Sequence, residues 1–431
     1  MSKTILCPYC FKKFENTEVE MQCQNEATKM ASNDRGGYSP VPVCPQSEDQ
    51  KFNDHWGTHV KTRRFFKPEF GFMEKMGWKP IQDKPCPHCS CDSHTFVCPN
   101  CHNALPVEMI EKGSEIISVI GGPASGKSNY IVALIHELKK YAGKLNLDIV
   151  LMQVGRTDEE KTSNKYKEAK RIIFEERMAL PKTQETTHPI PWIVRLESFT
   201  TKKAIYLVFY DTAGETFRDL STMQQDAKYF KESKGVIVVF DSLAIPKIHK
   251  ILQQKLNKKI EKGEESEGLE ILQAYNYNET WNSLSNFAES GHKELYKRPF
   301  AFVFTKFDAV MQNQDLLNCD FNDFTDDNGV FINNNYVKTG KLDLRDIDNC
   351  SQTISGCLKS EEVWDEYTLA NTIEKKLGDN ARFFGVSALG PMTDEVSIES
   401  EVVKPIRVAD PLLWILYKLG DFGIQVDGAK K

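Results

Sequence analysis

The stretch EIISVIGGPASGKSNYIVALIHELKK, residues 115–140, decides the fold of this chain. It joins a short apolar run to a segment with helical apolar spacing through a loop that matches G-x-x-x-x-G-K-[ST] at Gly121, Gly126, Lys127 and Ser128. In such a loop, backbone N–H groups and the helix dipole face phosphate oxygens, the lysine neutralises the outer phosphates, and the serine coordinates Mg²⁺. Strand, loop and helix all stand where this mechanism needs them. The sequence therefore predicts a nucleotide-phosphate site.

Apolar runs downstream of this loop alternate with long charged segments. Such short runs are typical of buried parallel strands in an α/β sheet. They occupy residues 116–120, 147–152, 204–210, 235–240, 300–305 and 381–386. Residues 191–197 are expected to add an antiparallel strand. The predicted fold class is α/β with a mainly parallel sheet.

Two stretches are too long to be plain connections in this sheet, and both are predicted to be insertions. Residues 241–299 contain an amphipathic pattern followed by an acidic run, which predicts a helix with a solvated face. Residues 309–380 are rich in Asn and Asp, and the turn signal at Asn328 and Gly329 favours a hairpin there.

Three further motifs follow apolar strands. In LVFYDTAGE, the Asp211 carboxylate can hold Mg²⁺, and the backbone N–H of Gly214 can reach a γ-phosphate. In FVFTKFDAV, Asp308 can accept both N1–H and the exocyclic amine of guanine, a donor pair that adenine lacks. Lys306 is expected to lay its stem along the base. In FFGVSALG, the backbone near Ser387 can reach the guanine carbonyl oxygen.

These motifs define one predicted site for GTP or GDP with Mg²⁺. The Mg²⁺ ligands are predicted to be Ser128 and Asp211. The nucleotide-binding residues are predicted to be Gly121, Ala124, Ser125, Gly126, Lys127, Ser128, Asn129, Gly214, Thr305, Lys306, Asp308, Ser387, Ala388 and Leu389.

The motif order GGPASGKS, DTAGE, TKFD and SAL resembles GTPases of the TRAFAC, Ras-like class over residues 114–425. The resemblance implies GTP hydrolysis, with Lys127 and Glu215 as catalytic residues. Ras-like proteins carry glutamine where this chain has Glu215, whose carboxylate can either act as a base or repel the γ-phosphate. Hydrolysis is therefore expected to be slow or to need a partner.

The switch I threonine that this class uses is not fixed by spacing. Thr186 and Thr187 are preferred over Thr157, Thr162 and Thr183. Arg218, Gln224 and Gln225 lie in the same switch as Glu215, but spacing assigns them no role.

Nine of the twelve cysteines precede residue 102, a pattern that favours metal over disulfides in a long chain without an export signal. One Zn²⁺ site is predicted at Cys86, Cys89, Cys98 and Cys101, and a second at Cys7, Cys10, Cys23 and Cys44, with His55 and His59 as rival ligands. Four thiolates leave no open position for water, so both sites are expected to be structural. The other cysteines are expected to be structural or free. Residues 1–110 are thus predicted to be a zinc-ribbon module, and residues 111–431 the GTPase domain.

Basic and aromatic residues alternate at residues 61–79, between the cysteine pairs. This pattern is compatible with RNA or single-strand binding by stacking. A small zinc module must also bury its few aromatic side chains, and docking of a protein is favoured over nucleic acid.

The formal charge of −6 gives no global positive field for nucleic acid or anionic lipid. No apolar run approaches the length of a membrane-spanning helix, and Cys7, Pro8 and Cys10 interrupt the amino end before a signal-peptide core could form. No membrane insertion and a cytoplasmic location are therefore expected.

The order of CPYCFKKF, the paired CPHC and CPNC motifs, the GTPase motifs and DPLLWIL resembles the double-GTPase family of bacterial conflict systems. The resemblance implies a regulatory switch in antiphage defence, with partners encoded nearby, either a second GTPase or an effector. Two alternatives remain open: a non-hydrolysing scaffold that holds nucleotide for its shape, and an NTPase stimulated by nucleic acid.

Overall fold

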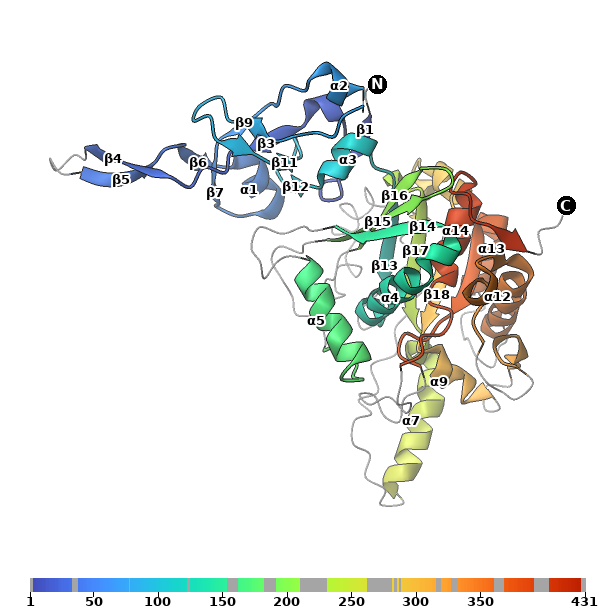
Figure 1. Ribbon diagram of the computed structural model, residues 1–431. Helices are drawn as coiled ribbons and strands as arrows, with labels where there is room; N and C mark the ends of the chain where they lie inside the picture. The colour runs from blue at the N-terminus through green and yellow to red at the C-terminus, as the bar shows by residue number, and fades with distance from the viewer. Residues whose placement is uncertain are drawn as a thin grey trace. The chain divides into compact units, whose positions relative to one another are not determined.

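The chain forms two compact units in the computed structural model (Figure 1). One consists mainly of Met1–Ile116, and the other contains Ile117–Leu151 and Thr162–Lys431, so the border lies near the predicted boundary at residue 110. The structure describes residues 3–32, 38–76, 78–121, 125–152, 162–181, 191–209, 231–261, 281–282, 285–286, 288–314, 319–326, 332–359, 368–390 and 403–427. Among these, no helix is long and apolar enough to cross a membrane.

The amino-terminal unit is built from very short strands and helices. Its strands are β1 (Thr4–Leu6), β2 (Lys13–Glu15), β3 (Glu20–Gln22), β4 (Thr28–Ser32), β5 (Tyr38–Pro42), β6 (Gln46–Glu48), β7 (Lys61–Arg63), β8 (Phe65–Phe66), β9 (Lys84–Pro85), β10 (Asp92–Ser93), β11 (Thr95–Val97) and β12 (Ala104–Leu105). Its helices are η1 (Asn16–Glu18), α1 (Gln50–Trp56), α2 (Phe72–Lys75) and α3 (Val107–Lys112). The largest sheet has the order β12-β11-β3-β8, and β4 and β5 form a separate hairpin.

The second unit is organised around one sheet in the order β14-β15-β16-β13-β17-β18-β20. Its strands are β13 (Ile116–Gly121), β14 (Leu147–Leu151), β15 (Trp192–Ser198), β16 (Ala204–Phe209), β17 (Gly235–Asp241), β18 (Phe300–Thr305) and β20 (Ala381–Gly385), with the short pair β19 (Leu342–Asp343) and β21 (Val426–Asp427) outside it. Its helices are α4 (Lys127–Leu145), α5 (Thr162–Phe174), η3 (Ser242–Ala244), α7 (Pro246–Glu261), η4 (Lys293–Lys297), α9 (Phe307–Met311), η5 (Asn322–Phe324), α11 (Tyr336–Thr339), α12 (Leu344–Lys359), α13 (Thr368–Leu377), η6 (Gly378–Asn380) and α14 (Asp410–Leu419).

Each apolar run that was predicted to be a strand forms one. β13, β17, β18 and β20 pair in parallel, as expected. β15 is antiparallel to both β14 and β16, which confirms the antiparallel strand at residues 191–197. Because β15 is antiparallel to both of its neighbours, β14 and β16 run in the same direction.

Alternate residues along the central strands pack on different groups of side chains. Val119, Ile237 and Val303 belong to an aliphatic core that includes residues of α4 and α14. Phe240 and Phe302 belong to the other face, where their ring centroids lie 6.2 Å apart. Burial of one such side chain contributes about 1.5–3 kcal/mol, so both faces stabilise the sheet edge that holds the motifs.

The predicted insertions are helical where the structure describes them. The helix expected in 241–299 is α7. Asn328 and Gly329, where a hairpin was expected, lie outside the described residues; on either side of them, the Ile332 N–H donates to the Phe324 carbonyl oxygen at 3.0 Å. Farther along this range, apolar residues recur at helical spacing in α12 and bury Ile347, Ile354 and Leu358. Cys319 and Cys357 form a disulfide, whereas Cys350 is a buried free thiol.

Candidate nucleotide and metal sites

The phosphate loop lies between the end of β13 and the start of α4, as predicted. Gly126 adopts a left-handed conformation with φ of 71° directly before the first helical residue, Lys127. Gly121 leaves no room for a side chain, because a Cβ atom there would lie 2.9 Å from the Val239 carbonyl oxygen and 2.7 Å from Ser125 Oγ. Glycine is therefore required at Gly121 by close contacts and favoured at Gly126 by its positive φ.

Thr305 connects the phosphate loop to the base motif. Its hydroxyl donates a hydrogen bond to the backbone carbonyl oxygen of Ser125 at 2.7 Å and lies 3.1 Å from the carbonyl oxygen of Phe240. Thr305 is buried, and its hydroxyl also limits the space above Gly126, where a Cβ atom would lie 3.3 Å from Thr305 Oγ1. Two motifs separated by 180 residues thus share one contact.

Lys306 is held by Asp241, a residue that the sequence motifs did not indicate. The ammonium group of Lys306 lies 2.8 Å from Asp241 Oδ2, and Asp241 Oδ1 accepts the backbone N–H of Leu243 at 2.9 Å. Asp241 is buried at the end of β17, directly opposite Thr305 in the parallel register with β18. The parallel register of β17 and β18, which has no signature in either motif, creates this pair.

Asp308 is buried beside Ser387, so the TKFD and SAL motifs meet at the same sheet edge. Burial raises the pKa of Asp308 to about 6, and a hydrogen bond with the Ser387 side chain opposes that rise. Backbone hydrogen bonds at Asp308 and Ala309 also favour the ionised carboxylate, which is the form that accepts two N–H donors from a base.

Phe307 fixes the spacing of these two motifs. Its backbone N–H donates to the Val386 carbonyl oxygen at 3.1 Å. Its ring covers Gly385 so closely that a Cβ atom there would lie 2.4 Å from a ring carbon. Ala388 and Leu389 follow in the same loop and are buried.

Other predicted nucleotide and magnesium residues are only partly described. Lys127 is buried and Ser128 half-buried in the first turn of α4. Asn129 Oδ1 accepts the backbone N–H of Leu180 at 3.0 Å, so its side chain fixes a loop. Thr162, the one described switch I candidate, is buried at the start of α5. Outside the described residues lie Ala124, Thr157, Thr183, Thr186, Thr187, Asp211, Gly214, Glu215, Arg218, Gln224 and Gln225.

The eight predicted zinc ligands do form two groups of four, but the predicted grouping was wrong. One tetrad contains Cys7, Cys10, Cys98 and Cys101. The other contains Cys23, Cys44, Cys86 and Cys89. In each tetrad, the four sulfur atoms lie within 4.8 Å of one another, and neither includes His55 or His59.

The pairing of β3 with β11 explains why the cysteine pairs combine differently from the predicted grouping. These strands are antiparallel, with Met21 opposite Phe96. Cys23 follows β3 and Cys98 follows β11, so the two cysteines leave opposite ends of the ladder, about 13 Å apart at the usual rise per residue. β11 carries the chain away from the Cys86 pair, and β3 carries it away from the Cys7 pair. Each tetrad therefore combines cysteines from distant parts of the sequence.

The geometry of both tetrads fits Zn²⁺. Tetrahedral Zn–S bonds of about 2.3 Å place the sulfur atoms about 3.8 Å apart. The observed separations are 3.7 Å between Cys7 and Cys101 and 3.8 Å between Cys10 and Cys98 in one tetrad, and 3.5 Å between Cys23 and Cys89 in the other. Hydrogen bonds from neighbouring thiols lower the pKa of Cys10, whereas the bond with Cys10 raises that of Cys101. Metal binding would displace the protons that these thiols share.

Three cysteine pairs adopt one knuckle geometry. In each pair, the backbone carbonyl oxygen of the first cysteine accepts the N–H of the residue four positions on. The residue directly after the second cysteine is left-handed: Phe11, Ser90 and His102 have φ of 53°, 57° and 50°. Backbone N–H groups of Tyr9 and Asn100 also reach sulfur at 3.4 Å. Backbone N–H donors to the sulfur atoms of Cys7 and Cys98 are therefore present.

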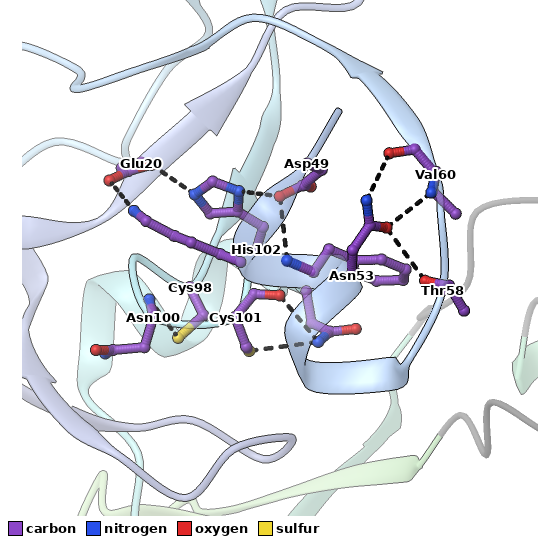
Figure 2. Close-up of polar contacts among 12 residues, drawn as sticks. Glu20, Asp49, Asn53, Thr58, Val60, Cys98, Asn100, Cys101 and His102 are labelled. Carbon is purple, nitrogen blue, oxygen red and sulfur yellow. Dashed lines mark hydrogen bonds and ion pairs between the residues drawn. The ribbon is translucent and has the colours of Figure 1, made fainter. Parts of the chain in front are cut away.

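His102 directly follows Cys101 and links the Cys7, Cys10, Cys98 and Cys101 tetrad to neighbouring segments through hydrogen bonds. Figure 2 shows its ring between Asp49, at 2.6 Å from Nδ1, and Glu20, at 2.9 Å from Nε2. Burial alone would lower the pKa of His102, but the hydrogen bonds with the two carboxylates raise it. Asn103 Nδ2 lies 3.3 Å from the Cys101 sulfur. These polar contacts tie the knuckle to α1, β3 and the loop before α1.

The basic and aromatic segment at 61–79 contributes aromatic rings both to the packing of the module and to its surface. The Phe65 ring lies 3.8 Å from that of His102, Phe66 packs against the second cysteine tetrad, and the Phe70 ring lies 6.4 Å from that of Phe96. Phe72 and Trp78, by contrast, are 68% and 63% exposed. The aromatic side chains of this segment therefore divide between half-buried rings at Phe65, Phe66 and Phe70 and exposed rings at Phe72 and Trp78.

A phosphate loop and a base motif at the edge of a mostly parallel sheet define an α/β P-loop domain of the GTPase type, here preceded by a module with two cysteine tetrads compatible with zinc. Residues 118–318 match the model of the family described as Double-GTPase 1. The resemblance to double-GTPases that the motif order predicted is thus confirmed for this part of the chain.

Two individual proteins are also similar to the chain. The "Putative ESX-1 scaffolding and assembly protein SaeC" of Mycolicibacterium smegmatis is 22% identical over 340 residues, which cover 75% of this chain and 80% of that protein. The crystal structure of the bacterial selenocysteine-specific elongation factor EF-Sec matches with a TM-score of 0.22 and 11% identity, over 64% of this chain and 25% of its own length.

Proposed function

We propose that this chain is a Mg²⁺-dependent switch that binds and hydrolyses GTP and regulates partner proteins. The contact between Thr305 and Ser125 supports the proposal most directly, because it sets the base motif against the phosphate loop. A phosphate loop alone does not distinguish bases, whereas Asp308 beside Ser387 can select guanine. The match to Double-GTPase 1 over residues 118–318 favours the same nucleotide.

In this proposal, each motif has one task. Lys127 and the loop amides hold the phosphates, while Ser128 and Asp211 hold Mg²⁺, which would neutralise charge on the β- and γ-phosphates. Glu215 would orient or deprotonate the attacking water. Departure of the γ-phosphate would then release the Gly214 loop and change the surface offered to a partner.

Calorimetry with GTP, GDP and ATP tests the nucleotide assignment. Wild-type protein should bind both guanine nucleotides, and Lys127→Ala should weaken binding by about a hundredfold, since a hydrogen-bonded charge contact contributes about 1.5–3 kcal/mol. Lys140→Ala is the matched control, because Lys140 lies on the same helix but pairs with Glu137 at 3.1 Å. Tight ATP binding without GTP binding would refute the proposal.

A second candidate is a scaffold that holds nucleotide without hydrolysing it. The similarity to a protein named for scaffolding and assembly favours it, as does the acidic residue Glu215 in the glutamine position. Phosphate release should be measured with and without proteins encoded beside this chain. Turnover in either condition supports the switch, and nucleotide binding without turnover in both supports the scaffold.

The cellular setting is also a proposal. The double-GTPase resemblance suggests a cytoplasmic role in bacterial antiphage defence, which phage plating on strains carrying wild-type or Lys127→Ala protein would test. Equal plating on both strains would contradict this role. Stimulation of turnover by RNA, lost at higher salt, would instead favour the nucleic-acid-dependent alternative.

A further inference from the structure

Arg407 is a buried cation in an unusual backbone conformation. Its side chain is 3% exposed, and its φ of 54° lies in the left-handed region that residues other than glycine seldom adopt. Such a conformation persists only where the surrounding structure enforces it. Arg407 lies outside the four nucleotide motifs, so its strain calls for a separate explanation.

Three segments hold this residue in place. The guanidinium group donates to both carboxylate oxygens of Asp346 in α12, at 3.2 Å for Nη1 and Oδ1, and its Nε lies 3.0 Å from Asp410 Oδ2. The backbone N–H donates to Asn333 Oδ1 at 2.6 Å. The bidentate contact with Asp346 fixes the plane of the guanidinium group as well as its position.

One path leads from Arg407 to the base motifs through the backbone. Its neighbour Ile406 forms an antiparallel bridge with Ser387, with hydrogen bonds of 2.8 and 3.1 Å. Ser387 in turn contacts the Asp308 carboxylate. The conformation at residue 407 therefore sets the position of the SAL loop.

A second path runs through aromatic rings. The guanidinium carbon of Arg407 lies 5.4 Å from the centroid of the Phe324 ring, within the range of a cation–π contact. The Phe324 ring lies 5.0 Å from that of Phe307, the residue before Asp308. The first path ends at Ser387 and the second at Phe307, and both residues flank the Asp308 carboxylate that would accept guanine.

We propose that Arg407 is a positioning residue for guanine selection: it holds Ser387 and Phe307 so that the Asp308 carboxylate keeps the geometry needed to accept two N–H donors. This inference rests on the proposed GTP site. It adds to that site a determinant of specificity that contacts no nucleotide.

The test compares the affinities of GDP and inosine diphosphate, which lacks the exocyclic amine that Asp308 would accept. Arg407→Lys keeps the positive charge but loses the planar guanidinium group that donates to both carboxylate oxygens of Asp346. We expect GDP to be weakened more than inosine diphosphate, with the preference for GDP falling about tenfold, as one displaced charged hydrogen bond would cause. Arg195→Lys is the matched control, because Arg195 is 12% exposed and pairs with Asp148 at 2.6 Å on β15.

The outcomes separate the two proposals. A lower melting temperature of Arg407→Lys with an unchanged GDP preference would make Arg407 a purely structural residue and overturn this inference. Wild-type protein without a preference for GDP would refute the proposed function itself. If Arg407→Lys does not fold, Asp346→Asn, which retains the side-chain shape, should lower the same preference, and its failure to do so would also overturn the inference.

Discussion

The hydroxyl group of Thr305 lies 2.7 Å from the carbonyl oxygen of Ser125, so the strand before the base motif is bonded to the phosphate loop itself. The bond is buried and joins two groups of the protein. It therefore links the phosphate and base halves of the site through the protein itself. A link of this kind reduces the ordering cost of binding.

Replacement of Thr305 tests this junction. Thr305→Val removes the hydroxyl at nearly constant volume and leaves the Ser125 carbonyl without its donor. Because an unsatisfied buried group costs about 1–3 kcal/mol, GDP affinity should fall about tenfold. Thr305→Ser keeps the hydroxyl and should bind GDP almost as wild type does. Equal calorimetric affinities for the two variants would show that the hydroxyl is unimportant.

Replacement of Asp308 tests base selection. Asp308→Asn can no longer accept both N–H donors of guanine, but its amide can donate to the carbonyl oxygen of xanthine. GTP should be weakened by at least about a hundredfold and xanthosine triphosphate much less, since sites built for a hydrogen bond discriminate strongly. Asp320→Asn serves as a control, because Asp320 is exposed and caps Asn322 at 3.0 Å. Equal weakening of both nucleotides would discredit the base assignment.

The raised pKa of Asp308 predicts how GDP affinity depends on pH. Since burial raises this pKa to about 6, the carboxylate that guanine requires becomes scarce below that pH, and GDP affinity should fall as pH decreases from 7.5 to 5.5. The folding stability of the nucleotide-free protein should change in the opposite direction. A folded-state pKa above the unfolded value means that the ionised group opposes folding above pH 6, and this cost shrinks as pH falls.

Affinity titrations of wild type and Asp308→Asn across this range check the prediction, because protonation of the nucleotide phosphates affects both proteins alike. The variant should show a smaller loss of affinity in acid. Identical slopes would mean that Asp308 does not titrate in this range or does not contact the base.

Paired cysteine substitutions test the tetrads through zinc content. The double variant Cys7→Ser with Cys98→Ser damages only one tetrad and should retain one zinc per chain. The double variant Cys7→Ser with Cys23→Ser damages both and should retain none. The grouping expected from sequence spacing predicts the reverse, so elemental analysis of these two proteins decides between them.

Sequence patterns predicted most of the second unit because its strands and motifs are local. Gly126 and Lys127 stand at a strand-to-helix junction that a single continuous segment specifies. The parallel strands follow from apolar runs, and topology alone brings Asp308 to the edge that Ser125 occupies. The partners of these residues were harder to foresee. Asp241 and Arg407 act through pairings between distant segments, which leave no local signature.

The cysteine module illustrates the same division. The knuckles at Cys7, Cys86 and Cys98 were predictable from C-x₂-C spacing, and so was the number of ligands. Which knuckle joins which was not, because that depends on β3 pairing with β11. Strands of three residues carry too little periodicity to reveal their partner in advance.

The crossed tetrads also bear on how the protein is made. During synthesis, the first knuckle leaves the ribosome with Cys7 and Cys10 but lacks half of its ligand set until Cys101 follows. An amino-terminal fragment that stops before Cys86 contains neither complete tetrad. Metal capture must therefore wait until Cys89 has been translated for one tetrad and Cys101 for the other, and cutting the module between Cys44 and Cys86 would leave neither half with a complete tetrad to retain zinc.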